Sequence, residues 1–66
     1  MDISKPINER LKNMGWTHYR LAKVTGIAPA TIYSMRDGGN VDNRTLDKIA
    51  SALGLEVWQI VKEASK

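Results

Sequence analysis

Residues 17–38 read THYRLAKVTGIAPATIYSMRDG and decide how this chain folds. Gly26 divides the segment into two short runs in which apolar residues recur at helical spacing. A connection this short makes two helices cross steeply, and Ala22 is small enough to allow a close crossing. Gly26 can also adopt the left-handed conformation that ends a helix. The segment therefore predicts two helices joined by a tight turn, with Ile27 and Ile32 packed between them and the core.

Residues that favour helix ends divide the whole chain into five predicted helices, at about 4–13, 17–25, 28–36, 42–53 and 56–64. Ser4, Thr17 and Asp42 are expected to cap three of them, because their side-chain oxygens can accept from the first free N–H groups. The expected core residues are Ile7, Leu11, Met14, Leu21, Ala22, Ile27, Ile32, Met35, Leu46, Ile49, Ala50 and Leu53. No segment alternates apolar and polar residues as a strand does. The predicted fold is all-α, a compact five-helix bundle in which the second and third helices form a helix-turn-helix.

Length and composition restrict the class of protein. The 66 residues make at most one domain, expected to span 1–66, and a chain this short buries only about 60% of the surface that its unfolded form exposes. Because there is no cysteine, disulfides and thiolate metal sites are excluded. The single histidine has no clustered carboxylates, so no metal is expected, and no cofactor or small-molecule ligand is predicted. No apolar run approaches the ~18 residues of a membrane span, and the first ten residues lack a secretory pattern. We therefore expect a cytoplasmic protein that does not bind membranes.

Positive charge is concentrated in the first half of the chain. The formal net charge is +3. Residues 1–36 hold six lysines and arginines against two acids, whereas residues 37–66 hold four against five. A basic half suits a polyanion such as DNA. A soluble domain that is merely basic is the alternative that charge alone leaves open.

A second stretch, LDKIASALGL at 46–55, lies downstream of the first. Together with Ala22, Gly26 and Ile32, it resembles the phage repressor and Cro type (XRE-like) of helix-turn-helix DNA-binding domain over residues 7–61. The resemblance implies a lambda-repressor-like bundle whose third helix, about 28–36, enters the major groove of double-stranded DNA. It further implies a prokaryotic or phage-encoded transcriptional regulator, expected to be a Cro-like repressor that binds a palindromic operator as a homodimer. An ordinary pair of packed helices is the structural alternative.

The third helix is expected to read bases with the face opposite its buried residues Ile32 and Met35. Helical geometry and the resemblance together indicate Ala28, Pro29, Ala30, Tyr33 and Ser34 for these contacts. This face lacks the Gln, Asn and Arg that make bidentate contacts to adenine or guanine. DNA shape and dimer geometry are therefore expected to carry part of the selectivity. For Tyr33, a half-buried position on the helix flank is the alternative.

Contacts to the DNA backbone are expected around the same helix. The residues are Thr17, His18, Thr31, Arg36, Asn40, Asn43 and Arg44. His18 matches a position where the family commonly has a glutamine bonded to phosphate, and a histidine there predicts mildly pH-sensitive binding. The alternative for His18 is a solvated surface side chain, which is also the interpretation that we favour for Lys23. Asp37 lies on the same side, where its charge repels phosphate, so a local role in the turn is expected for it.

The last predicted helix carries large apolar residues close together. Relatives of this type often dimerise there, so the expected dimer interface is Leu55, Val57, Trp58 and Val61. A role for Trp58 as a plug of the monomer core is equally open, and Trp16 is expected in the core. One rival function is a protein-binding module of the antitoxin type that also regulates its own operon. Catalysis is not expected, because the sequence has no carboxylate pair near its histidine and no phosphate-binding glycine loop.

Overall fold

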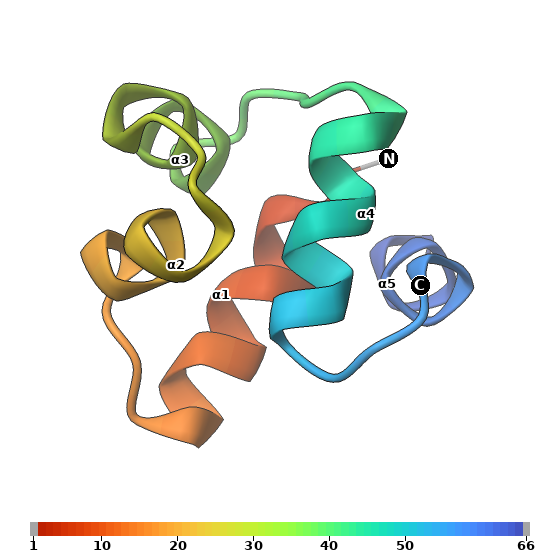
Figure 1. Ribbon diagram of the computed structural model, residues 1–66. Coiled ribbons are helices and arrows are strands. Elements are labelled where there is room, and N and C mark those ends of the chain that lie inside the picture. The colour runs from red at the N-terminus through yellow and green to blue at the C-terminus, as the bar shows by residue number, and fades with distance from the viewer. Residues whose placement is uncertain (1, 66) are drawn as a thin grey trace.

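The computed structural model describes residues 2–65, which form five α-helices and the loops that connect them. The helices are α1 (Ser4–Met14), α2 (His18–Thr25), α3 (Pro29–Arg36), α4 (Asn43–Ala52) and α5 (Val57–Ala64) (Figure 1). No strand occurs in residues 2–65. The predicted all-α, five-helix fold is confirmed, and each predicted helix lies within one or two residues of the observed one.

Two of the three predicted side-chain caps are found, at the starts of α2 and α4. Thr17 Oγ1 accepts a hydrogen bond from the amide nitrogen of Arg20 at 3.1 Å. Asp42 Oδ1 accepts one from the amide nitrogen of Thr45 at 2.8 Å. The expectation for Ser4 is wrong: Ser4 is the first residue of α1 and is itself a donor. Its amide nitrogen donates to Asp2 Oδ1 at 3.0 Å, and its hydroxyl donates to the same atom.

The turn between α2 and α3 takes the form that residues 17–38 predict. Gly26 has φ of +73°, and its N–H donates to the carbonyl oxygen of Ala22 at 2.9 Å. Ala22 is buried, and Ile27 packs against the core from the turn. Pro29 opens α3, where its missing N–H has no helical partner to lose.

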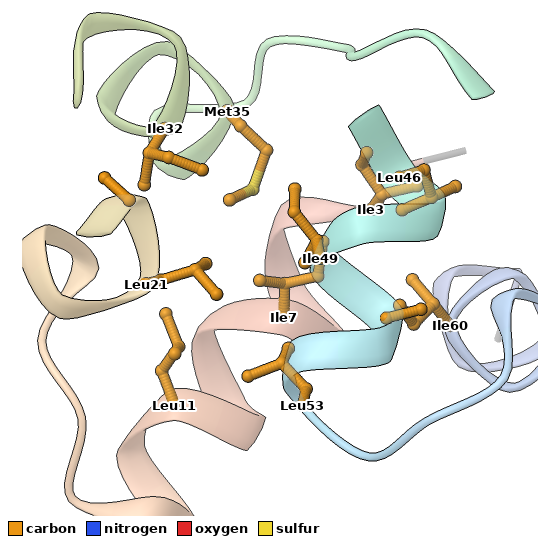
Figure 2. Close-up of a cluster of buried hydrophobic side chains, with 12 residues drawn as sticks. Ile3, Ile7, Leu11, Leu21, Ile32, Met35, Leu46, Ile49, Leu53 and Ile60 are labelled. Atoms are coloured by element: carbon orange, nitrogen blue, oxygen red, sulfur yellow. The ribbon is translucent and has the colours of Figure 1, made fainter. Parts of the chain in front are cut away.

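The core gathers side chains from all five helices into one cluster, which Figure 2 shows. Its largest fully buried members are Ile7, Leu11, Leu21, Ile32, Met35, Ile49, Leu53 and Ile60. The buried residues of α4 are those predicted for it, with Leu53 completing the stripe just after its end. Met14 and Trp16 are only partly buried and pack against the edge of the cluster. The core is thus small and continuous, and it fixes all five helices relative to one another.

The way the helices pack keeps α3 and α5 apart. The α2 helix packs on α3 and α4, α1 packs on α3 and α5, and α4 packs on α5. In Figure 1, α3 and α5 lie at opposite sides of the molecule, with α1 and α4 between them. The outer face of α3 and the exposed face of α5 are therefore distinct surfaces.

None of the helices in residues 2–65 has the length and apolarity needed to cross a bilayer.

Candidate nucleic-acid interface

The outer face of α3 exposes every residue predicted to contact bases. Ile32 and Met35 are fully buried, so the opposite side of this short helix faces outward. The exposed residues are Ala28, Pro29, Ala30, Thr31, Tyr33 and Ser34. Three of them are small and apolar, so this face can pack closely against another surface, and Ser34 adds one hydroxyl that can donate or accept.

Tyr33 lies on the flank of that face and has a charged neighbour. Its exposed fraction is 36%, and the guanidinium of Arg36 lies 5.0 Å from its ring centroid. This cation–π contact holds the ring beside the last turn of the helix. An exposed fraction of 36% is compatible both with a contact to DNA and with the half-buried position of the alternative interpretation.

Arg36 and Asp37 form a bidentate ion pair at the end of α3. Arg36 Nε lies 2.9 Å from Asp37 Oδ1, and Arg36 Nη2 lies 3.3 Å from Oδ2. The hydrogen bond from Arg36 lowers the pKa of Asp37, and the same bond raises the pKa of Arg36. Asp37 thus has a local partner, which explains how an acid is accommodated beside a basic surface. The pair also occupies the guanidinium of a residue predicted to contact phosphate.

Asn8 connects the start of α2 to the end of α3, although it belongs to α1. Its Oδ1 lies 2.7 Å from Nε2 of His18, and its Nδ2 donates to the carbonyl oxygen of Arg36 at 3.3 Å. Partial burial lowers the pKa of His18, the charge of Arg36 adds to this, and Asp37 acts in the opposite direction. His18 is therefore a half-buried, hydrogen-bonded residue and not a freely solvated one. Sequence reasoning missed Asn8, because its partners are distant in the chain.

The loop between α3 and α4 lies against the end of α3. The N–H of Gly39 donates to the carbonyl oxygen of Ser34 at 2.8 Å. A Cβ at position 39 would lie 2.7 Å from that oxygen, so the close approach requires glycine. The loop runs along the same edge of the molecule as α3, as Figure 1 shows. The predicted backbone-contact residues of this region, all exposed, are Asn40, Asn43 and Arg44.

Tyr19 and Lys23 lie on the side of α2 that borders the start of α3. The ammonium of Lys23 lies 5.4 Å from the ring centroid of Tyr19, whose exposed fraction is 51%. Both residues line a shallow hollow together with Ala28 and Pro29. Lys23 therefore rests on an aromatic ring, and the sequence interpretation of a simply solvated lysine omits this neighbour. Tyr19 was not among the predicted site residues.

The α5 face comprises Leu55, Val57, Trp58 and Val61, and its most exposed member is Trp58. The exposed fraction of Trp58 is 61%, whereas Ile60 is the residue that α5 buries. The other three are partly buried, and Leu55 and Val57 pack against the core. The interpretation of Trp58 as a plug of the monomer core is therefore wrong. Beside it, Trp58 and Lys62 line a groove against Lys5, Pro6 and Glu9 of α1.

The described part of the chain has no group of three or more His, Cys, Asp or Glu side chains that could hold a metal ion. A family model described as "Cro/C1-type HTH DNA-binding domain" matches residues 6–62. The match includes α2, α3 and α4 and all but the ends of α1 and α5. Comparisons with curated proteins and with solved structures gave no match.

Proposed function

The chain belongs to the family of Cro/C1-type helix-turn-helix DNA-binding domains, and from this premise we propose that it is a sequence-specific transcriptional regulator. In this proposal it is a Cro-like repressor, and residues 1–66 act as one domain on double-stranded DNA. The observation that carries the proposal is the outer face of α3: its small and polar residues are exposed, while the opposite side is fixed in the core. A helix so presented fits the major groove, which admits a single α-helix.

The base contacts that we propose are those of Ala28, Pro29, Ala30, Tyr33 and Ser34. The three apolar residues suit the methyl group of thymine, and the Ser34 hydroxyl suits one hydrogen bond to a base edge. No residue of this set offers a bidentate pair of donors or acceptors. Each base contact is therefore weak, and we propose that the shape and deformability of the operator supply the rest of the selectivity.

Backbone contacts are proposed from two places held against α3. At the start of α2 are Thr17 and His18, and Asn8 connects His18 to the last turn of α3. In the loop and at the start of α4 are Asn40, Asn43 and Arg44, which follow Gly39, whose N–H donates to the Ser34 carbonyl of α3. On α3 itself, the residues are Thr31 and Arg36. Because both places are fixed to α3, phosphate contacts there would set its register in the groove.

A homodimer formed through the α5 face completes the proposal. A tryptophan exposed to 61% on a helix remote from α3 supports it, since tryptophan is enriched where protein interfaces are buried. Two copies related by two-fold symmetry would present two α3 helices to half-sites about 34–36 Å apart. Such a dimer would repress by covering a palindromic operator, in the cytoplasm of a prokaryotic cell where chromosomal or phage DNA lies.

Selection of bound duplexes from random DNA tests the proposal. We expect two inverted half-sites with centres one helical turn, or a multiple of it, apart. On the selected duplex and on mismatched ones, Arg44→Ala should weaken binding of all sequences equally, whereas Ser34→Ala should change the preference among them. Lys12→Ala, which removes one charge from an exposed residue of α1 outside both proposed surfaces, is the matched control for Arg44→Ala. Selection of no common site, or a uniform loss with Ser34→Ala, would contradict the assignment.

A further inference from the structure

The partners of Asn8 determine which nitrogen of His18 carries a proton. A carbonyl oxygen can only accept, so the nitrogen end of the Asn8 amide must face the carbonyl of Arg36, as the 3.3 Å contact has it. The oxygen end then faces His18 Nε2 at 2.7 Å, and this oxygen is also only an acceptor. Nε2 must therefore be the donor. In the neutral ring, Nδ1 is left with a lone pair and no proton.

This arrangement limits the hydrogen bonds that His18 can make to a phosphate. The inference rests on the proposed function, which brings a phosphate to the start of α2. Phosphate oxygens accept hydrogen bonds, so an unprotonated Nδ1 cannot bond to one. When the ring takes up a second proton, Nδ1 becomes a charged donor while Nε2 keeps its bond to Asn8. The charges that act on the ring are those of Arg36 and Asp37, both at the end of α3 and paired with each other.

We propose that Asn8 is a positioning residue that makes His18 a phosphate donor in its protonated form alone. DNA binding then takes up one proton at His18, so the affinity rises as the pH falls. Burial lowers the pKa of His18 below its ordinary value of 6.5 in the free protein, and a bound phosphate raises it. The affinity therefore changes in the pH range between the pKa of His18 in the free protein and its higher pKa in the complex. His18 is the single histidine of the chain, so loss of the transition when it is replaced attributes the transition to this ring.

Binding of the selected duplex, measured by fluorescence anisotropy at constant ionic strength from pH 5.5 to 8.5, tests the proposal. A phosphate that raises the pKa of His18 by one unit strengthens binding about tenfold over this range. In Asn8→Ala the ring can turn and donate while neutral, so the gain should shrink to less than about threefold. His18→Gln, which donates at every pH, should show a flat profile. Asn13→Ala, which removes an exposed asparagine of the same helix, should retain the wild-type profile.

A wild-type profile that is flat, or that Asn8→Ala leaves unchanged, overturns the proposal while the proposed function stands. A folded protein that binds no duplex at any pH overturns the proposed function as well. The nitrogen-15 shifts of the His18 ring provide a readout that needs no DNA and no variant. We expect a protonated Nε2 and an unprotonated Nδ1 in the neutral ring, and the opposite tautomer would overturn the proposal.

Discussion

At the scale of single residues, the Arg36–Asp37 ion pair predicts how the affinity for DNA can be raised. Asp37→Asn keeps the shape of the side chain and removes the charge that holds the guanidinium. The guanidinium that we propose as a phosphate contact is then no longer shared with a carboxylate, and repulsion of the DNA by that carboxylate is lost. We expect tighter binding to all duplexes, and a steeper slope of log K against log salt because the charge of Arg36 is no longer neutralised by its neighbour. Titration of one duplex at several salt concentrations measures both.

Asp47→Asn is the matched control, because Asp47 is an exposed acid on α4 and the change in net charge is the same. If both variants tighten binding equally, general electrostatics explains the effect and the specific role of the ion pair is contradicted.

Individual site residues were predictable where their position on a helix decides their exposure. Ala30 and Ser34 are exposed because Ile32 and Met35 are buried, and the sequence shows all four. The partners of exposed polar residues were not predictable in the same way. Asn8 meets a residue 10 positions away and another 28 positions away, and no local pattern encodes such contacts.

At the scale of helices, Asp42 predicts a specific effect of acid on stability. Its hydrogen bond to Thr45 lowers the pKa of Asp42 from the ordinary value of 3.8. The ionised carboxylate therefore stabilises the folded state above that value, and the contribution is lost as the pH falls through the lower folded value. Asparagine caps helices about as well as aspartate but does not titrate. Asp42→Asn should therefore leave the stability at pH 7 nearly unchanged and lessen its fall below about pH 4.

Urea denaturation at pH 7, 4 and 3 measures this effect, with Asp47→Asn as the comparison. An acid response in Asp42→Asn equal to that of the wild type would contradict the role given to this cap. The pKa values of Asp2 and Asp37 are also lowered, so part of the acid sensitivity should remain.

Helix ends follow from the sequence when the capping side chain is adjacent to the helix that it caps. Thr17, Gly26 and Asp42 each act within four residues of their own position. At α1 two candidate side chains compete, and Asp2 is the acceptor because an ionised carboxylate accepts from both the amide and the hydroxyl of Ser4. When two neighbouring side chains can both cap a helix, the local sequence does not specify which of them accepts the hydrogen bond.

At the scale of the whole molecule, Trp58 and Ile60 predict opposite consequences of truncating neighbouring residues on α5. Trp58 is 61% exposed and Ile60 is 1% exposed. Trp58→Ala should leave the monomer folded, weaken the dimer and reduce binding to a two-half-site duplex more than to a single half-site. Ile60→Ala should instead cost about 2–5 kcal/mol of stability, because it leaves a cavity in the core.

Sedimentation equilibrium and thermal unfolding separate these outcomes. A Trp58→Ala protein that remains a dimer, or that is destabilised as much as Ile60→Ala, would contradict the proposed interface.

The fold itself was predictable because the apolar periodicity of each helix is strong and the chain offers one core. The exposure of Trp58 on α5 was not predictable, since a tryptophan in a short apolar helix is compatible with burial in the monomer or in a dimer.

The measurement that most directly tests the central claim is the salt dependence of binding to the selected duplex. If α3 lies in the major groove with phosphates bound at the start of α2 and at the loop before α4, several counterions are released. Log K should then fall linearly with log salt, with a slope of about −4 or steeper. Absence of binding, or an affinity that stays constant from about 50 to 200 mM salt, would contradict the account.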